Sequence, residues 1–262
     1  FEVSHALHFA ERAEDNFKSH DFLYVWAARD ILDRLSDITR VFSSVLLCGV
    51  HTADYLGEKF PDAAVMKNPS PELLLPYSGH YDLIIVMGEF HRSNDLPGLL
   101  IQLRRALKPD GVMIAAFAGG ETLCELRAAL LQGEINVMGG ASPRGLPFVD
   151  KQQMAALMQR AAFTLPVVDS EILSVSYRDM FHVMEDVRGM GESNCLVARH
   201  RRFTPSRVFS EAAQFYQKNF AEQDGRVSAS YEIIFLIGWA PHESQQKPAK
   251  RGSGQVSLTE IL

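Results

Sequence analysis

The chain has 262 residues, of which 47% are apolar and 22% charged. This composition is close to the globular average and excludes wholesale disorder. The 26 basic and 32 acidic residues give a net charge of -6, so the chain as a whole has no electrostatic reason to bind nucleic acid or anionic lipid. No apolar run approaches the roughly 18 residues of a membrane span. The three cysteines, Cys48, Cys124 and Cys195, are isolated, which excludes a disulfide framework or zinc ribbon and favours a reducing compartment.

The first part of the chain predicts helices followed by a buried strand. Apolar residues recur at spacings of three and four between Asp21 and Leu35, so we expect a helical segment over residues 1–40. The short apolar run from Ser44 to Gly49 is typical of a strand buried on both faces of a parallel sheet. A short helix over 51–60 and a weak strand over 63–66 follow.

A strand–helix–strand unit is the clearest pattern in the sequence. Residues 81–87 form a continuous apolar strand pattern. Asp95 is placed to cap the next helix, with Pro97 in its first turn. Lys108-Pro-Asp-Gly111 ends that helix with a turn, and a strand over 112–117 comes next. This spacing predicts parallel neighbouring strands joined by a right-handed crossover.

The second half continues the alternation of helices and strands. Asp150 is placed to cap a helix, and strands are expected over 166–177 and 231–239. The stretch 178–228 is too long for a connector and predicts a helical insertion. The polar residues 242–262 are expected to be an extended tail. We therefore predict one α/β domain over residues 1–262, doubly wound around a mostly parallel sheet, with the insertion before the last strand.

In a doubly wound sheet, ligands bind beyond the carboxyl ends of the strands. Neither a Gly-x-Gly-x-x-Gly fingerprint nor a P-loop is present, and Gly49 is equally well explained as a turn glycine. Glu89, His91 and Arg92 follow the strand that ends at Met87 and are expected to face the same crevice as Gly49. A nucleotide-like ligand is therefore predicted to contact residues after both strands, namely Gly49, Val50, His51, Met87, Gly88 and Glu89.

Other polar patterns have stronger structural than functional interpretations. His80-Tyr81-Asp82 has the spacing of part of a facial iron triad, but it opens a buried strand at the end opposite the ligand site. His5 and His8 lie near a terminus without a third ligand in sequence reach. We therefore predict no metal site and assign no catalytic residue. The polar turn 189–194, between apolar segments, is either an internal loop cap or part of a substrate lid.

The sequence contains several longer motifs, namely Lys108–Gly111, Gly119–Arg127, Ser142–Phe148, Met184–Asn194 and Gly238–Ser253. These motifs resemble the mitochondrial complex I assembly factor 5 family and its bacterial homologues, and the resemblance covers nearly the whole chain. It implies the fold of S-adenosylmethionine-dependent methyltransferases, related to the malonyl-carrier methyltransferases, with a seven-stranded sheet whose last strand is antiparallel. Family members have been described both as methyltransferases and as hydroxylases of an arginine on a complex I subunit.

The sequence departs from the family pattern where the cofactor should bind. Leu47 stands at the position of an aspartate, and His51 and Ala53 stand at positions of glycines. After the second expected strand, residues 66–68 offer no carboxylate for the ribose hydroxyls, and the segment 70–81 is shortened. Lost ribose hydrogen bonds alone would cost about 1–3 kcal/mol, so we expect affinity for S-adenosylmethionine to be weak or lost.

Three functional interpretations follow. The first is an S-adenosylmethionine-dependent methyltransferase with an altered cofactor motif. The second is a complex I assembly factor that hydroxylates a protein arginine, and the third is a non-catalytic client-binding protein of methyltransferase fold. In each case the expected partner is a protein client such as a respiratory complex I subunit, with no nucleic acid. The expected location is the cytoplasm of a bacterium or the mitochondrial matrix of a eukaryote.

Overall fold

The computed structural model describes residues 1–246. Most of the tail predicted over 242–262, and the last part of the family motif Gly238–Ser253, therefore lie outside the described residues. The elements in chain order are α1 (Val3–Ala13), η1 (Phe17–Ser19), α2 (Phe22–Ser36), β1 (Val45–Cys48), α3 (Thr52–Leu56), β2 (Ala64–Met66), α4 (Pro71–Leu74), β3 (Tyr81–Met87), η2 (Phe90–Arg92), α5 (Leu96–Ala106), β4 (Leu107–Ala118), α6 (Cys124–Met138), α7 (Lys151–Arg160), β5 (Thr164–Tyr177), α8 (Met180–Gly189), α9 (Ser206–Phe220) and β6 (Val227–Trp239).

The described strands form one mixed sheet in the order β2-β1-β3-β4-β6-β5. β2, β1, β3 and β4 are mutually parallel, whereas β6 is antiparallel to both of its neighbours. The predicted α/β fold is thus confirmed, including the parallel neighbours 44–49, 82–87 and 112–117 and the antiparallel strand beyond them. Because β1, β3 and β4 run in one direction, their carboxyl ends meet at one edge of the sheet.

The prediction of seven strands was wrong for the residues that the structure describes, where the sheet has six. The missing strand was expected between β2 and β3. In its place, Ser70 caps the short helix α4 by accepting the N–H of Leu73, with Pro71 in the first turn. Proline and the cap favour a helix start, so β2 remains the edge of the sheet.

Helices cover the two faces of the sheet because alternate strand residues point to opposite sides. One face packs α4, α5 and α7 against side chains such as Leu46, Ile84 and Met113. The other packs α2 and α3 against side chains such as Leu47 and Ile85. Asp95 and Asp150 cap α5 and α7 as predicted, each accepting a backbone N–H three residues on.

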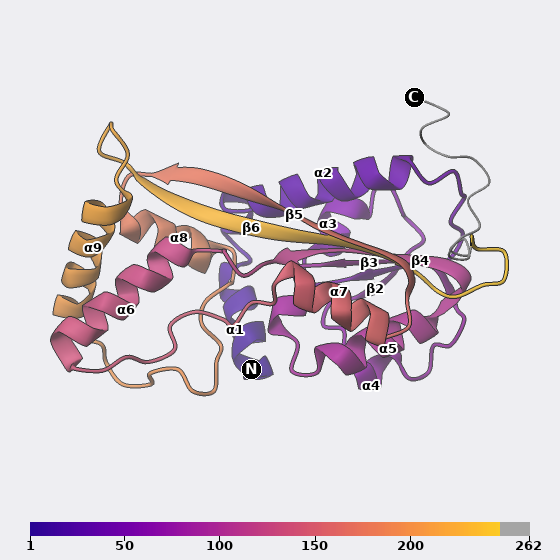
Figure 1. Cartoon of the computed structure of the whole chain (residues 1–262), viewed down its shortest axis with the longest axis horizontal. Coiled ribbons are helices and arrows are strands. Elements are labelled where there is room, and N and C mark those ends of the chain that lie inside the picture. Colours follow the sequence, from indigo (N-terminus) through magenta and orange to yellow (C-terminus); the bar gives the residue numbers. More distant parts are fainter. Residues whose placement is uncertain (247–262) are drawn as a thin grey trace, which may run out of the picture.

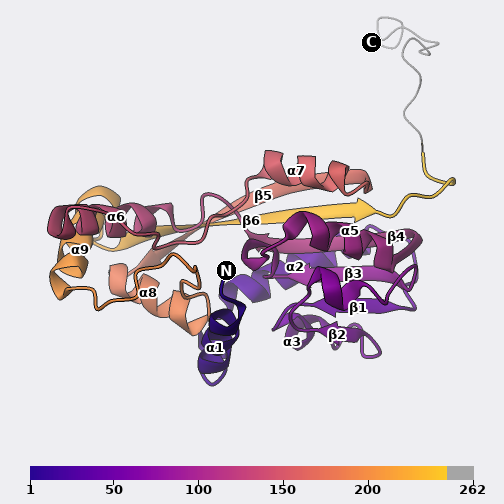
Figure 2. The same cartoon turned by 90° about the horizontal axis from the view of Figure 1, so that it is seen from below.

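The last two strands are longer than expected and carry a second cluster of helices. β6 pairs with β4 only over residues 233–239, yet its pairing with β5 continues back to Val227. The projecting half of this hairpin packs against α6, α8 and α9 in a separate apolar core. Figure 1 shows these helices at the left end of the molecule, away from the parallel strands, and Figure 2 shows the same separation from below.

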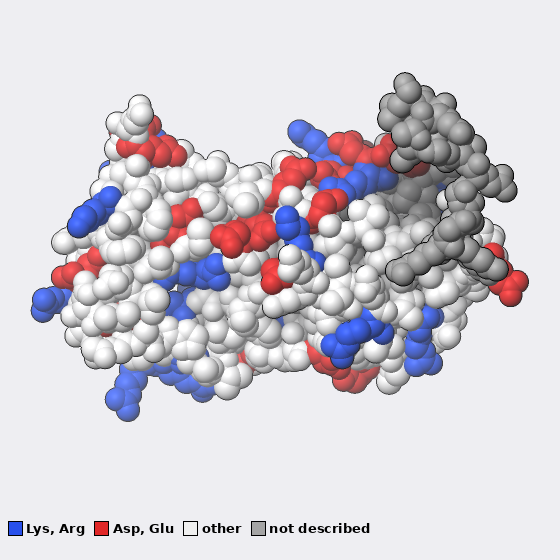
Figure 3. Space-filling view, in the orientation of Figure 1, with Lys and Arg blue, Asp and Glu red and all other residues white. Residues whose placement is uncertain are grey.

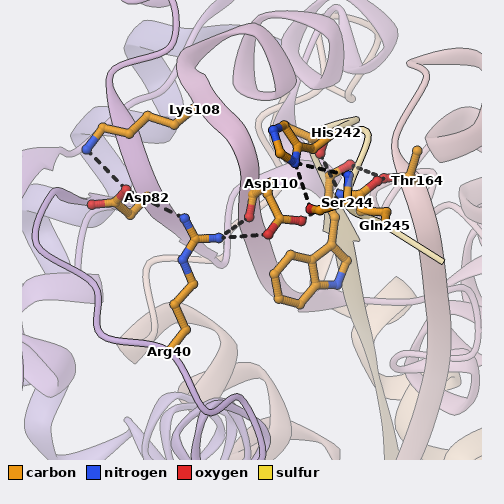
Figure 4. A network of polar contacts seen from close by, with 10 residues as sticks. Arg40, Asp82, Lys108, Asp110, Thr164, His242, Ser244 and Gln245 are labelled. Carbon is orange, nitrogen blue, oxygen red and sulfur yellow. Dashed lines mark hydrogen bonds and ion pairs between the residues drawn. The ribbon is translucent and has the colours of Figure 1, made fainter.

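At the opposite end of the sheet, polar side chains tie loops together. Lys108 Nζ lies 3.1 Å from Asp82 Oδ1, and Arg40 contacts both Asp82 and Asp110. Gln245 donates to Asp110 and accepts from Thr164 (Figure 4). This network fastens the segment after β6 at the sheet edge far from the carboxyl ends of β1 and β3.

Over the face that Figure 3 shows, acidic and basic side chains are interspersed. In the part of the chain that the structure covers, no helix combines the length and the apolar character that crossing a bilayer requires.

Candidate functional site

The loop after β1 approaches the end of β3 so closely that only glycine fits. Gly49 has φ +122°, and a Cβ there would lie 2.3 Å from the carbonyl oxygen of Met87 and 2.5 Å from Thr52 Oγ1. The predicted neighbours Gly49 and Met87 are therefore in contact. The glycine serves this backbone approach whether or not a ligand binds.

The next two residues of the loop are occupied by contacts within the chain. The backbone N–H of Val50 donates to Glu89 Oε1 at 3.2 Å. The ring of His51 stacks on Phe17, with centroids 3.5 Å apart and planes inclined by 13°. His51 Nδ1 lies 3.1 Å from Asp54 Oδ2, and burial lowers the pKa of His51. The Val50 amide and His51 Nδ1 are thus paired within the chain, whereas the buried His51 Nε2 has no hydrogen-bond partner among residues 1–246.

After β3, a tight turn brings two charged side chains under helix α2. Gly88 has φ +77°, and a Cβ there would lie 2.9 Å from the hydroxyl oxygen of Tyr24. Glu89 is nearly buried. Burial raises the pKa of its carboxyl, and the opposing effect of Arg92, whose Nη2 lies 3.5 Å away, does not cancel it.

Glu192, in the turn after α8, closes over this group. Its Oε2 lies 3.0 Å from His91 Nε2, its Oε1 accepts the Tyr24 hydroxyl at 3.2 Å, and Arg92 Nη1 lies 3.8 Å away. Burial alone would raise the pKa of Glu192, but Arg92 and His91 outweigh it and lower the pKa to about 2. Glu192 is therefore an anion at neutral pH. Its bonds join the helical cluster to the end of β3.

The same turn is fastened to the loop between α6 and α7. Asn194 Nδ2 donates to the carbonyl of Pro143 at 2.8 Å. Glu134, with 1% of its surface exposed, accepts from the backbone N–H and hydroxyl of Ser142 and from Arg144. Of the two interpretations of the turn 189–194, the structure supports a loop cap that also forms one wall of a cavity.

A cavity of about 150 Å³ lies where the carboxyl ends of β3 and β4 meet the helical cluster. Its walls are mainly apolar, with a few convergent polar groups, as in small-molecule and side-chain binding sites. It is hereafter the central cavity. Its lining comprises Leu23, Tyr24, Ala27, Met87, Gly88, His91, Ala116, Phe117, Ala118, Thr122, Leu123, Leu126, Arg127, Leu130, Arg144, Gly145, Leu146, Phe148, Val187, Met190, Glu192, Asn194, Tyr231 and Ile233.

The six predicted contact residues surround more than one hollow. Met87 and Gly88 line the central cavity. Val50 and Glu89 line a second hollow covered by the start of α1, and Val50 and His51 line a third beside the rest of α1. The structure thus brings Gly49, Val50 and Glu89 together as predicted, but it separates His51 from the central cavity.

Sequence patterns did not single out several residues of the central cavity. Arg127, Arg144 and Phe148 lie within family motifs, so the resemblance marked their segments without marking their role. Glu192 lay in the polar turn already noted. For Tyr24 the sequence predicted only a place in a helical segment. Its hydroxyl contacts Glu192, 168 positions away, and no local pattern marks such a distant contact.

The residues weighed as metal ligands lie elsewhere. Asp82 accepts hydrogen bonds from Ser43 and Ser44 and pairs with Lys108 at the far end of the sheet. His5 lies on α1 beside Glu2. Within residues 1–246, no three or more His, Cys, Asp or Glu side chains gather closely enough to hold a metal ion.

Comparison with known proteins identifies the family. No family model matches the chain. The chain is 35% identical over 266 residues to "Arginine-hydroxylase NDUFAF5, mitochondrial" of Danio rerio, covering 92% of this chain and 82% of that protein. The chain belongs to the NDUFAF5 family. The resemblance inferred from the motifs is thereby confirmed.

More distant matches show the wider relationship. The chain is 33% identical over 148 residues to a malonyl-[acyl-carrier protein] O-methyltransferase of Methylovorus, covering 56% of this chain and 47% of that protein. A crystal structure of a candidate methyltransferase from Bacillus halodurans superposes with a TM-score of 0.52 at 13% identity, covering 81% of this chain and 98% of that one. This NDUFAF5-type chain therefore has the S-adenosylmethionine-dependent methyltransferase fold.

The residues at the cofactor position of that fold do not fit S-adenosylmethionine. The Val50 amide is bonded to Glu89, and the His51 ring, 8% exposed, is stacked on Phe17. β2 ends at Met66, followed by Lys67 and Asn68, so no carboxylate follows it to accept the ribose hydroxyls. Binding would require breaking these contacts without a replacement for the missing acceptor.

Proposed function

We propose that this chain is an NDUFAF5-type assembly factor that hydroxylates an arginine side chain of a protein client, received in the central cavity. The observation that carries the proposal is its 35% identity, over 92% of the chain, to a protein named arginine hydroxylase. The cavity adds support because half of its lining residues come from the motif segments 119–127, 142–148 and 184–194. These are the segments that keep the family pattern, whereas the loop after β1 has lost it.

The cavity suits a guanidinium on a long apolar stem. Glu192 is an anion and accepts two hydrogen bonds, from Tyr24 and His91. A carboxylate offers about four acceptor positions, so about two remain for the paired N–H groups of a guanidinium. The apolar side chains around Glu192 would contact the methylene stem.

Hydroxylation replaces a C–H bond with C–OH and is a two-electron oxidation. The oxidant and the electrons must come from a redox group or co-substrate, and we assign no residue to that step. The role of the chain in this proposal is to bind and orient the arginine and to exclude water. Methyl transfer is not proposed because the loop after β1 does not fit S-adenosylmethionine.

The client in this proposal is a respiratory complex I subunit. The site of action is the cytoplasm if the host is a bacterium and the mitochondrial matrix if it is a eukaryote. The named relative from Danio rerio is mitochondrial.

The test replaces the NDUFAF5-type protein of a host cell with this chain and maps complex I subunits by mass spectrometry. We expect one arginine-containing peptide to gain one oxygen atom. Glu192→Gln should reduce this product at least about tenfold, because one charge-assisted contact is lost. Glu58→Gln, a change at an exposed position, serves as the matched control.

Two outcomes would overturn the proposal. A methyl group in place of the oxygen would restore the methyltransferase interpretation. Complete complex I assembly without any modified arginine would favour a non-catalytic client-binding protein.

A further inference from the structure

Arg127 is a positioned cation without a counter-ion in the wall of the central cavity. It lies in the first turn of α6 and is partly buried. Its Nη2 donates to the carbonyl of Gly120, and its guanidinium carbon lies 5.6 Å from the ring centroid of Phe148. A Cβ at Gly145 would lie 2.8 Å from Arg127 Cδ. The side chain is thus held on three sides.

The other arginine of the cavity differs in its partners. Arg144 forms an ion pair with the buried carboxylate of Glu134 and donates to Thr204. Arg127 forms no ion pair with any carboxylate of residues 1–246, which distinguishes it from Arg144. The buried Nε atoms of both arginines donate to no group among these residues. A partly desolvated charge without a counter-ion is costly. This arrangement is explained if an anionic ligand supplies the missing partner.

Contacts along the wall place this cation apart from the Glu192 anion. Glu192 bonds to His91, the His91 ring lies 5.9 Å from that of Phe148, and Phe148 contacts Arg127. The cavity therefore carries a negative group and a positive group, separated by two rings. A ligand that pairs with both groups carries a cation and an anion.

We propose that Arg127 binds the carboxylate of an aspartate or glutamate that neighbours the target arginine in the client. The inference rests on the proposed function, because it takes the client arginine to face Glu192. It adds a specificity rule: the client segment presents one basic and one acidic side chain within an apolar stretch. A free acyl carboxylate would neutralise Arg127 but would leave the remaining acceptors of Glu192 facing hydrocarbon.

The test measures peptide binding and needs no oxidation chemistry. Three fluorescein-labelled, acetylated peptides share a background of alternating leucine and serine. The first carries arginine and glutamate, the second arginine and glutamine, and the third glutamine and glutamate. The charged positions are two residues apart, so that both side chains face the same way. Affinity for the full-length chain is measured by fluorescence anisotropy.

We expect the wild-type chain to bind the arginine–glutamate peptide at least about tenfold more tightly than either other peptide, since each loses one charge-assisted contact. Arg127→Gln should abolish the preference for glutamate over glutamine and leave the arginine–glutamine peptide unaffected. Arg127→Glu should prefer a peptide with lysine in place of glutamate, which keeps the test valid if Arg127→Gln folds poorly. Arg105→Gln, exposed on α5, is the matched control.

Other outcomes separate the two proposals. Equal affinity of the wild-type chain for the arginine–glutamate and arginine–glutamine peptides would overturn the role of Arg127, even if arginine hydroxylation is observed in cells. Arg127-dependent binding of the glutamine–glutamate peptide without arginine hydroxylation would support the carboxylate site and contradict the proposed function. If no peptide binds but hexanoate raises the melting temperature of the wild-type chain only, the ligand is a free carboxylate and the inference is wrong. If neither peptides nor hexanoate bind, it is wrong as well.

Discussion

The carboxylate of Glu89 accepts the backbone N–H of Val50, with 3.2 Å between nitrogen and Oε1. This bond joins the loops that follow two neighbouring parallel strands, at the edge where doubly wound folds bind nucleotides. The chain therefore provides the acceptor for a backbone donor that a ligand would otherwise use. A polar ligand at this loop must first displace Glu89, and displacement leaves this nearly buried carboxylate with Arg92 as its remaining partner.

We therefore expect S-adenosylmethionine not to stabilise the chain. A ligand at 100 times its dissociation constant would raise the free energy of unfolding by about 2.7 kcal/mol. Thermal unfolding with millimolar S-adenosylmethionine should show no change in melting temperature, and isothermal titration should show no heat of binding. A dissociation constant in the low micromolar range would contradict both the expectation and our account of the loop.

The close approach at Gly49 yields a stability prediction. Gly49→Ala should lower the free energy of unfolding by about 2 kcal/mol or more, because its φ of +122° strains any side chain and its Cβ would meet the Met87 carbonyl at 2.3 Å. Gly139→Ala is the matched control. Gly139 also has positive φ, at +69°, but a Cβ there meets nothing within 4 Å, so about 1 kcal/mol is expected. Urea denaturation of both variants measures the difference, and equal losses would show that the contact with Met87 is unimportant.

The sequence allowed most of the sheet to be predicted, since buried strands and capped helices leave local patterns. The runs at 44–49 and 81–87 identified β1 and β3, and Asp95 marked the start of α5. The extension of β6 back to Val227 was not predictable, because β5 is the one described strand with which residues 227–232 pair. Their partners lie 50 to 60 positions away in sequence and leave no local signal.

The candidate site was less predictable because its contacts join distant segments. Val50 and Glu89 were expected to meet since each follows a neighbouring strand. The pairing of Glu192 with His91 spans 101 positions, and the stacking of His51 on Phe17 depends on how the N-terminal helices lie. Such contacts are set by the packing of α1, α2 and α8 and not by any motif.

Asn194 should control the order of the loop over residues 142–148. Asn194→Asp removes the donor to the Pro143 carbonyl while leaving an oxygen to accept the Leu196 N–H. One such hydrogen bond contributes about 1 kcal/mol, so amide exchange in this loop should become about fivefold faster. Hydrogen–deuterium exchange mass spectrometry measures this, with β3 as the internal reference. Unchanged exchange over 142–148, or faster exchange in β3, would contradict a local role.

The ionisation of Glu192 predicts how stability depends on pH. Its pKa is about 2 in the folded chain, against about 4.3 in an unfolded one. The unfolded state therefore takes up a proton first as the pH falls. The stabilisation of the folded chain by the Glu192 charge is therefore complete above about pH 4.3, and it is lost progressively as the pH approaches 2.

Glu192→Gln isolates this contribution from that of the other carboxylates. At pH 7 the variant should be less stable than the wild type by about 3 kcal/mol, the equivalent of the pKa difference. This difference in the free energy of unfolding (the gap) should become smaller as the pH falls from about 4.3 towards 2, because the wild type then loses the charge that the variant never had. Urea denaturation of both proteins at pH 7, 5, 4 and 3 measures the gap, with Glu58→Gln expected to match the wild type throughout. A gap that stays constant across this range would show that the loss comes from packing around Glu192 and not from its charge beside Arg92 and His91.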